Sequence, residues 1–572
     1  MLLEFQRRTL PIRPKVVEAI RVNKILELAP EHLRPRAEAY LRYVTDVSVY
    51  PLIPPTPKLQ TTALSRDDLR MLADRYSILK RPPKASTFGF KVAEIEKERC
   101  RPVWACAIND AEFPEKPPEI TLHPYAKIMQ SMNRADYFCQ VDGKSMFDQF
   151  FIDNEDIRSY FSFLVGDSVV ALNRIPMGFK YAPGVAQITS EVISFDPPNE
   201  EEPMHCECIV HLDNLGFVWW RKGQENHEEE KRQIVRKMER FFKRAVEANF
   251  QLNEFTVEEM RKMNASNIWE GLQNHLVKRG KPANQPFTFL GVTYDLQQVS
   301  TKRVAEKTKK KLTAVAAIIA RQQISPVASY RQIAMLVGLI RYASKIHEFH
   351  NEDFTTYATL QKMSAECQKD ESWWDRKIGH IHAHNLTPLV EIAERILQSS
   401  PVPIEREWNC EKAIRLFVDA SKVGWGAVAL HPNGRSEVVK GRWTQPSLFE
   451  SSVRAEPKGV EETIAALKLA PETTVLIITD HEGLVWASQA VQAHTYYYHK
   501  ALRLIQTMGL NAKFLFIQGV SNPADEPSRD RPMTTPPQRL IELGAAAGAG
   551  AAWALQFPNS GRIATMRVMT GD

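Results

Sequence analysis

The stretch Tyr137-Phe-Cys-Gln-Val-Asp142-Gly-Lys-Ser-Met-Phe147 opens with a mainly apolar run and reaches an acid followed by glycine. This pattern predicts a buried strand over residues 137–141 that presents Asp142 at its end. A second run, Cys208-Ile-Val-His-Leu212, presents Asp213 in the same way. Carboxylate oxygens are the ligands that hard divalent cations prefer, so two such acids could share a metal ion.

Between these runs lies Arg174-Ile-Pro-Met-Gly-Phe-Lys-Tyr-Ala-Pro183. Pro176 and Gly178 interrupt regular structure there, and a helical pattern follows through Gln187. Further along, apolar residues recur at helical spacing over residues 225–250, 304–320 and 330–345. We expect helices in these three ranges.

The whole chain has the composition of a globular protein, with 572 residues that are 44% hydrophobic and 25% charged. This excludes disorder, collagen and coiled coil as descriptions of the whole, and the length suggests roughly three to five domains. No apolar run reaches the length of a membrane span, so no membrane partner is expected. Seven scattered cysteines favour reduced thiols and an intracellular protein, cytoplasmic or nuclear.

A second series of acids follows a Pro-rich break at Gln398-Ser-Ser-Pro-Val-Pro-Ile404. Asp419 ends a predicted strand, Glu456 begins a helical pattern, and Asp480 ends the β-branched run Thr474-Val-Leu-Ile-Ile-Thr479. Asp525 opens a short final element. These signals predict a separate α/β domain that starts near residue 405.

The three segments around Asp142, residues 174–183 and Asp213 resemble, in this order, motifs A, B and C of retroelement reverse transcriptases. In that family two Mg²⁺ ions, for which Mn²⁺ can substitute, lie between the carboxylates of motifs A and C. The resemblance implies that Asp142 and Asp213 are metal ligands and catalytic residues, with Asn214 beside them.

The same resemblance implies substrate-binding residues. Phe147 occupies the place of an aromatic ring that excludes a ribose 2′-hydroxyl, which suits a deoxynucleotide polymerase. Met177 and Gly178 belong to the loop that packs against the nascent base pair. Cys100-Arg-Pro-Val-Trp104 is similar to the fingers strand whose arginine holds the triphosphate, which makes Arg101 the candidate. Phe289-Leu-Gly-Val-Thr293 resembles the turn that grips the primer.

One motif departs from the family pattern. Where the family usually has Tyr-x-Asp-Asp, this sequence has His211-Leu-Asp-Asn214. An Asn oxygen can coordinate Mg²⁺, yet the change lowers the charge of the site from −3 to −2. Two interpretations stay open: a lineage adapted to Asn214, or a polymerase fold kept after its activity declined.

The second series of acids resembles retroelement ribonuclease H, whose four carboxylates hold two Mg²⁺ ions beside the scissile RNA phosphate. By this resemblance Asp419, Glu456, Asp480 and Asp525 are catalytic metal ligands. The ending Asn522-Pro-Ala-Asp-Glu-Pro-Ser-Arg529 is similar to that of Gypsy-type and DIRS-type retrotransposons. Gln518-Gly519 stands where cellular ribonucleases H often carry a histidine.

A basic segment at residues 302–321 suggests a surface for nucleic acid. Seven cations face one acid, Glu306, so the segment alone carries the +6 surplus of the whole chain. In the family this segment opens the thumb, which rides on template and primer phosphates, and Lys307 and Lys310 are our candidates there. A solvated helix face explains any single lysine equally well.

We therefore predict a multidomain protein of α/β and α+β class, with a right-hand polymerase followed by a ribonuclease H-like α/β domain. The expected divisions are a helical extension over 1–59, fingers and palm over 60–300, a thumb over 301–365, a connection over 366–404, ribonuclease H over 405–535 and a loose tail over 536–572. The partners implied are an RNA template, a DNA primer, an RNA:DNA hybrid and deoxynucleoside triphosphates, in retrotransposon replication and within a virus-like particle or the nucleus.

Two alternatives remain at this stage. The chain could be a degenerate retroelement protein that binds nucleic acid or has a structural role, with or without ribonuclease H activity. His205, Cys206, Cys208 and His211 could also form a zinc cluster, although Cys-x-Cys on one strand without a second pair at finger spacing is more simply the start of a hairpin.

Overall fold

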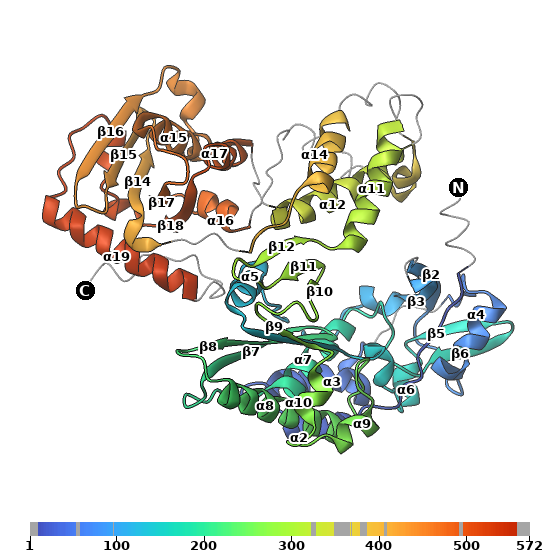
Figure 1. Cartoon of the computed structure of the whole chain (residues 1–572). Helices are drawn as coiled ribbons and strands as arrows, with labels where there is room; N and C mark the ends of the chain where they lie inside the picture. The colour runs from blue at the N-terminus through green and yellow to red at the C-terminus, as the bar shows by residue number, and fades with distance from the viewer. Residues whose placement is uncertain are drawn as a thin grey trace. The chain divides into compact units, whose positions relative to one another are not determined.

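The computed structural model describes residues 10–52, 58–94, 97–321, 328–347, 367, 369–377, 386–404, 409–490 and 496–556 (Figure 1). The chain divides into two compact units. The first comprises Met1–His123, Arg134–Leu290 and Leu296–Gln298. The second comprises Pro124–Asn133, Gly291–Asp295 and Val299–Asp572. Among the described residues, no helix combines the length and the apolar character that a membrane crossing requires.

The central sheet of the first unit has the order β7-β8-β4-β9. Its strands are β4 (Tyr137–Asp142), β7 (Met204–His211), β8 (Asn214–Arg221) and β9 (Leu276–Lys278), and all the pairings are antiparallel. The helices α7 (Ala182–Ser194) and α8 (His227–Ala248) pack below the sheet in Figure 1. Phe217 of β8 contacts Phe241 of α8 edge to face, so the apolar faces of both elements form one core. The predicted strand at 137–141 and helix at 225–250 are confirmed.

Two smaller sheets complete the first unit. One is the hairpin β2 (Thr87–Glu94) and β3 (Arg99–Cys106), and the other has the order β1 (Tyr76–Ile78), β6 (Ser168–Leu172) and β5 (Ser162–Val165). The unit also contains four short helices: α4 (Arg66–Met71) before β1, α6 (Glu155–Arg158) between β4 and β5, and α9 (Val257–Lys262) and α10 (Ile268–Leu272) between α8 and β9. The strand β10 (Phe287–Phe289) also belongs to this unit, and its Phe287 ring stacks on that of Phe138.

The N-terminal residues are helical only in part, which corrects the expected helical extension. Residues 10–21 are extended, and α2 (Val22–Leu28) and α3 (Arg34–Thr45) follow. Both helices pack on α7, and Ala37 and Leu41 of α3 belong to the same core as the central sheet. Pro11 and Pro14 explain the extended part, because proline and the residue before it disfavour helix. Residues 1–9 lie outside the described part of the chain.

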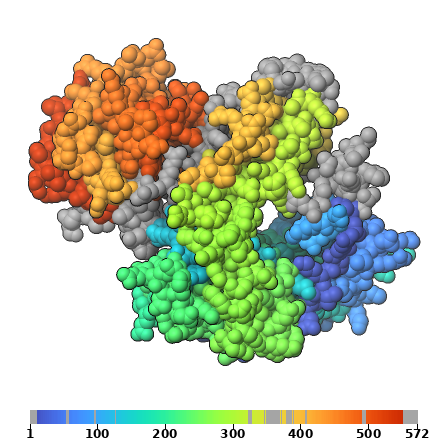
Figure 2. Space-filling model, viewed as in Figure 1, coloured from blue at the N-terminus to red at the C-terminus, as the bar shows by residue number. Residues whose placement is uncertain are grey.

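In the second unit, three helices form a bundle: α11 (Glu306–Ala320), α12 (Tyr330–His347) and α14 (Thr387–Gln398). They contact one another pairwise, and Figures 1 and 2 show α11 and α14 side by side. The helix α5 (Tyr125–Arg134) and the strands β11 (Val292–Asp295), β12 (Thr301–Val304) and β13 (Val402–Pro403) belong to the same unit. The helices predicted at 304–320 and 330–345 are confirmed.

The basic segment is only partly exposed. Lys307 and Lys310 lie exposed on α11, where we predicted phosphate-binding residues. Lys302, however, is buried, and its ammonium lies over the ring of Tyr125 at 5.7 Å. The alternation of β12 directs this side chain inward, so Lys302 is not part of the predicted phosphate-binding surface.

The buried His347 of α12 links the bundle to the strand β12 beside it. Its Nε2 accepts a hydrogen bond from the Val304 N–H of β12, and its Nδ1 lies 2.9 Å from the Ser399 hydroxyl. Burial, with Lys309 and Lys302 nearby, lowers the pKa of His347 to about 4. The folded state therefore holds this ring neutral, while the unfolded chain protonates it near pH 6.5.

The lowered pKa of His347 predicts a loss of local stability in acid. Because the folded pKa lies below the unfolded one, its contribution is complete above pH 6.5 and falls as the pH drops toward 4. The free energy of local opening at Val304, measured by hydrogen exchange and corrected for intrinsic rates, should fall by about 2 kcal/mol between pH 7.5 and 5. His347→Gln keeps an acceptor but cannot titrate, so its opening energy should change much less. An equal fall in that variant would contradict the assignment.

The C-terminal part of the second unit is a five-stranded sheet with the order β16-β15-β14-β17-β18. The strands are β14 (Ile414–Ala420), β15 (Gly424–Leu430), β16 (Ser436–Arg442), β17 (Thr474–Thr479) and β18 (Asn511–Phe516), and β14, β17 and β18 run parallel. The helices α15 (Ser452–Leu467), α16 (Glu482–Ala490) and α17 (Tyr496–Thr507) pack with the sheet, and α18 (Asp525–Ser528) contacts β14 and β15. The strands predicted here from apolar runs are confirmed.

The expected loose tail is wrong over its first twenty residues. Pro537–Gln556 forms the helix α19, and Leu540, Leu543 and Ala547 are buried in a core with Phe417 and Val428. The alanine-rich stretch has high helix propensity, which outweighs its low complexity. A Cβ atom at Gly544 would lie 2.3 Å from a Leu430 methyl carbon, so glycine permits this close approach to β15. Residues 557–572 lie outside the described part.

Candidate active sites

The first candidate site forms where β4 ends beside the turn between β7 and β8. Asp142 pairs with Asn214 across the two strands, and the Gly143 N–H donates to the Asp213 carbonyl at 2.7 Å. The turn itself is Leu212-Asp213, with Leu212 in the left-handed region at φ 56°. The two predicted acids therefore lie at neighbouring points of one sheet edge.

Two polar side chains of α7 hold this turn. Gln187 accepts from the Leu212 N–H at 2.7 Å and donates to the Val210 carbonyl, and Ser190 donates to the Leu212 carbonyl at 2.6 Å. Both side chains are buried. These bonds satisfy the buried backbone of a turn whose non-glycine residue has positive φ, and so they fix the position of Asp213.

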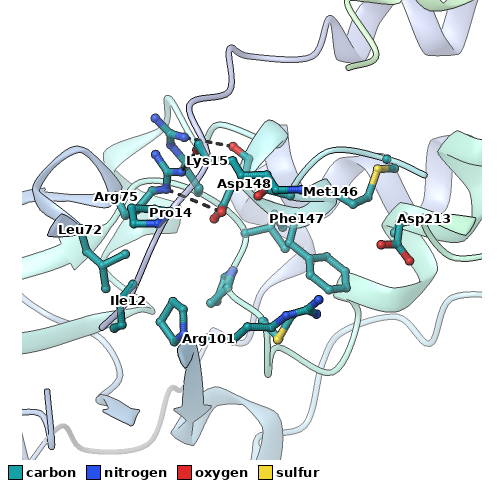
Figure 3. A pocket seen from close by; sticks show the side chains of 18 of the residues that line it. Ile12, Pro14, Lys15, Leu72, Arg75, Arg101, Met146, Phe147, Asp148 and Asp213 are labelled. Atoms are coloured by element: carbon teal, nitrogen blue, oxygen red, sulfur yellow. Dashed lines mark hydrogen bonds and ion pairs between the residues drawn. The ribbon is translucent and has the colours of Figure 1, made fainter. Parts of the chain in front are cut away.

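A cavity of about 480 Å³ lies over the two acids. Asp142, Asp213, Phe147, Met177 and Arg101 all line it, although they come from four separate stretches of sequence. Phe147 and Arg101 point into it in Figure 3. Arg101 also forms an ion pair with Glu94 at 2.7 Å.

Gly178 does not line this cavity but supports it from behind. Its φ is 122°, and a Cβ atom there would lie 1.9 Å from the Trp104 carbonyl oxygen. Its own carbonyl accepts from the Asn109 side chain at 2.7 Å, and the Met177 carbonyl accepts from the Trp104 N–H. Glycine therefore lets the loop lie directly on β3, which places Met177 at the cavity wall.

The acids of this site are electrostatically strained in the absence of a cation. Burial and the charge of Asp213 raise the pKa of Asp142, and burial raises the pKa of Asp213. A third acid, which the sequence did not single out, accepts the Asp142 N–H at 2.9 Å: burial and Asp142 raise the pKa of Glu254 to about 7. A bound divalent cation would relieve this repulsion.

Asn214 supplies the strongest indication that the site fits a metal. Its side-chain oxygen is buried and has no hydrogen-bond partner. An unsatisfied buried oxygen is costly, and this one lines the cavity with Asp142 and Asp213. The donor set is two carboxylates and one amide oxygen, all of them hard ligands suited to Mg²⁺.

The variant Asn214→Asp tests the two interpretations of the asparagine that stands where the family usually has a second aspartate. If the site is a weakened member of the family pattern, a third carboxylate should raise primer extension severalfold in Mg²⁺ and reduce any preference for Mn²⁺. The readout is extension rate against metal concentration. A severe loss of extension would show instead that the surroundings of Asn214 are adapted to a neutral amide.

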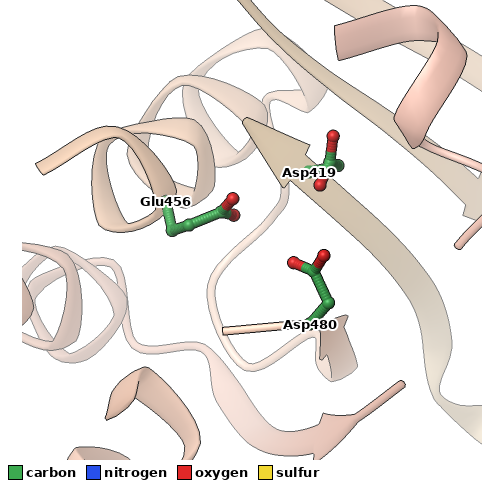
Figure 4. Close-up of side chains that lie close together, drawn as sticks. All are labelled: Asp419, Glu456 and Asp480. Carbon is green, nitrogen blue, oxygen red and sulfur yellow. The ribbon is translucent and has the colours of Figure 1, made fainter. Parts of the chain in front are cut away.

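The second candidate site lies at the carboxyl ends of β14 and β17. Asp419 projects from β14, Asp480 follows β17, and Glu456 comes from α15. One ligand oxygen from each lies within 4.8 Å of the others, and Figure 4 shows the three side chains converging. Among the described residues this is the one group of three or more acids, histidines or cysteines that meets this distance.

Charge and burial make this cluster suited to a divalent cation. Burial, with Asp480 and Asp525 nearby, raises the pKa of Asp419 to about 6, and burial raises the pKa of Glu456 well above its usual value. Glu456 Oε2 is buried and has no hydrogen-bond partner. Two buried carboxylates beside a half-buried one, with an unpartnered oxygen among them, are unfavourable unless a cation neutralises them.

Asp525, the fourth predicted ligand, lies outside the group of three. Its carboxylate pairs with Arg529 at 3.0 Å, although its charge still raises the pKa of Asp419 and Asp480. The Ser528 hydroxyl donates to Asp419 Oδ2 at 2.5 Å, which the sequence did not suggest. The predicted ending thus contributes a positioning hydroxyl as well as an acid.

The loop at Gln518-Gly519 lies directly on Asp480. A Cβ atom at Gly519 would be 2.7 Å from Asp480 Oδ2. Any side chain at this position would displace the carboxylate, and the loop therefore carries glycine. Near this loop, Tyr498 is buried and its hydroxyl forms a hydrogen bond with His481 Nε2.

The residues of the zinc alternative lie on one strand, β7. No three of His205, Cys206, Cys208 and His211 bring ligand atoms within 4.8 Å of one another. Cys206 and Cys208 are instead near the buried Lys237, and burial raises the pKa of the Cys208 thiol to about 12. Side chains of one strand whose ligand atoms do not converge do not make a zinc site.

No protein-family model matches the sequence, and no curated protein matches it either. Matches to solved structures have TM-scores of about 0.4. One is a foamy viral protease-reverse transcriptase dRH in complex with double-stranded DNA, with TM-score 0.41, 13% identity, and coverage of 88% of this chain and 83% of that one. The same viral protein in complex with an RNA/DNA hybrid gives TM-score 0.41 and 12% identity, with 88% and 64% coverage. A third structure, with double-stranded DNA, gives TM-score 0.40 and 13% identity, with 88% and 98% coverage.

Proposed function

We propose that the chain is an RNA-directed and DNA-directed DNA polymerase that also degrades the RNA of RNA:DNA hybrids. One observation carries the polymerase proposal. A single cavity of about 480 Å³ gathers Asp142, Phe147, Met177, Asp213 and Arg101, the residues that resemble separate polymerase motifs. Charged and apolar side chains from four separate stretches that converge on one cavity indicate a site for one substrate.

The chemistry of the first site follows from its side chains. Asp142, Asp213 and the Asn214 amide oxygen would hold two Mg²⁺ ions, which when bound supply activation of a primer 3′-hydroxyl and neutralise a triphosphate. The Phe147 ring would lie under the incoming sugar and exclude a ribonucleotide. Arg101 would bind the triphosphate, because a guanidinium matches phosphate oxygens in charge and geometry.

For the second site we propose hydrolysis of RNA in a hybrid. Asp419, Glu456 and Asp480 would hold divalent metal beside the scissile phosphate, and Asp525 would join them once released from Arg529. The metal when bound supplies the activated water and stabilises the leaving oxygen. From the ending at 522–529 we infer a retrotransposon of Gypsy or DIRS type as the origin of the chain.

The experiment that tests the polymerase proposal is extension of a labelled DNA primer on an RNA template. Purified protein with Mg²⁺ and deoxynucleotides should lengthen the primer, and EDTA should stop the reaction. Extension that persists in EDTA, or no extension in either Mg²⁺ or Mn²⁺, would count against it.

A second candidate function is hybrid degradation without DNA synthesis. It is favoured by one observation: among the described residues only Asp419, Glu456 and Asp480 form a group of three metal-binding side chains within 4.8 Å. At the first site, the residue that pairs with Asp142 across the strands is the neutral Asn214, and no third side chain joins Asp142 and Asp213 in such a group among the described residues. Hybrid cleavage by a protein that never extends a primer would select this alternative.

A further inference from the structure

The extended residues 10–21, here called the N-terminal strap, cross the first unit beside the candidate polymerase site. At one end Ile12 lies parallel to Cys100 of β3, whose N–H donates to the Pro11 carbonyl at 2.8 Å. At the other end the Ile20 N–H donates to the Gln149 carbonyl at 2.9 Å, and the Arg21 N–H donates to that of Ala248. The strap is therefore fixed at both ends.

Buried apolar side chains anchor the strap, and its cationic side chains line the candidate site. Ile12, Val17 and Ile20 are at most 5% exposed. Between them, Arg13 and Lys15 line the same cavity as Asp142 and Asp213. Figure 3 shows Lys15 at this cavity.

Hydrogen bonds hold both the backbone and the side chain of Lys15 in place. Its carbonyl accepts a hydrogen bond from the buried Arg75, and its ammonium donates to the Asn253 side-chain oxygen. Asn253 also lines the cavity, and its N–H donates to the Asp142 carbonyl at 2.9 Å. These bonds place the ammonium beside the strand end that carries Asp142.

The cavity has a surplus of positive charge. Three carboxylates and seven cations line it, the cations being Arg13, Lys15, Arg75, Lys97, Arg99, Arg101 and Arg174. Acids already pair with four of the arginines: Glu94 with Arg99 and Arg101, and Asp74 with Arg75 and Arg174. Lys15 donates instead to a neutral amide. Burial and the neighbouring cations lower the pKa of Lys15, so an anion entering here would be favoured.

We propose that Arg13 and Lys15 of the N-terminal strap bind the triphosphate of the incoming nucleotide. The inference rests on the proposed polymerase function and adds two substrate-binding residues to it. A nucleotide is favoured over a nucleic-acid duplex because a cavity of about 480 Å³ has the size of small-ligand sites. A triphosphate also supplies the negative charge that the lining lacks.

Lys15→Ala should raise the KM for deoxynucleotides about tenfold or more with a smaller change in kcat, because a charge-assisted hydrogen bond to phosphate is lost. Lys15→Arg should keep most of the affinity, and Arg13→Ala should change KM in the same direction as Lys15→Ala. Lys24→Ala is the matched control, since Lys24 lies on α2 and pairs with Glu27 at 3.1 Å. If Lys15→Ala does not fold, Lys15→Met keeps the aliphatic stem and removes only the charge.

Two equilibrium measurements separate this inference from the polymerase proposal. The Kd of the protein for Mg²⁺-dATP should rise about tenfold in Lys15→Ala, and the Kd for an RNA:DNA hybrid should stay unchanged. If wild type never extends a primer but shows this difference, the phosphate site stands and polymerisation fails. The inference is overturned if wild type extends primers and Lys15→Ala has the same KM and Kd for the nucleotide. It is also overturned if Lys15→Ala weakens only the binding of hybrid.

Discussion

We expect Asp480→Asn to slow cleavage of the RNA strand in an RNA:DNA hybrid by about a thousandfold or more while DNA synthesis continues. Asp480 shares a site with Asp419 and Glu456, with ligand oxygens within 4.8 Å of one another. Removing one carboxylate weakens metal binding where charge develops on the scissile phosphate, which costs several kcal/mol of transition-state stabilisation. The measurement is the single-turnover rate of cleavage of an end-labelled RNA.

The matched control for this variant is Glu437→Gln. It also removes a carboxylate from the C-terminal sheet, but Glu437 lies on β16 and pairs with Arg435 at the surface. Its cleavage rate should equal that of wild type. Cleavage by Asp480→Asn at the wild-type rate would refute the ribonuclease H assignment, and so would equal cutting of single-stranded RNA by wild type, since hybrid recognition depends on the groove and the 2′-hydroxyls.

Asp213→Asn should have the converse effect. Primer extension should fall by about a thousandfold or more, because the site would retain a single carboxylate, Asp142, among its three hard oxygen ligands. Hybrid binding and hybrid cleavage should persist. Since asparagine preserves the size of the side chain, the turn held by Gln187 and Ser190 should keep its shape, and the melting temperature should stay close to that of wild type.

Asp167→Asn is the matched control for the polymerase site. Asp167 is exposed in the turn between β5 and β6 of the same unit. Its variant should extend primers at the wild-type rate. Undiminished extension by Asp213→Asn would remove the assignment of Asp213 as a metal ligand of the polymerase site.

The strand-end acids were predictable because their signal is local. An apolar run that stops at an acid predicts both a strand and the position of its side chain, and Asp142, Asp213, Asp419 and Asp480 all lie at such ends. Glu456 lies on α15 and was identified by the resemblance, as the second of the four acids in order. Local periodicity likewise predicted the long helices.

The residues that support these acids were not predictable, because their partners are distant in sequence. Gln187 bonds to a turn 25 residues later, and Ser528 bonds to Asp419 across 109 residues. Glu254 accepts the Asp142 N–H across 112 residues, and no pattern around it indicates this contact. Gln187 and Ser190 lie in a helical run that carries other polar residues as well, so the sequence did not mark them out.

The sequence-based predictions for the two ends of the chain were wrong in part. The run of alanine and glycine at residues 544–552 indicated a tail, but small residues are what allow α19 to pack closely on β15. The extended strap at 10–21 has no periodicity, and its role depends on contacts with β3 and residues 248–253. Tertiary packing decided both segments.

The central claim is that one chain carries two separate metal-dependent sites with complementary reactions. The most direct measurement uses one substrate, a DNA primer with one label on an RNA template with another, incubated with Mg²⁺ and deoxynucleotides. Wild type should lengthen the DNA and shorten the RNA, Asp213→Asn should only shorten the RNA, and Asp480→Asn should only lengthen the DNA. Loss of both reactions in either single variant, or RNA shortening by wild type without any DNA growth, would contradict the account.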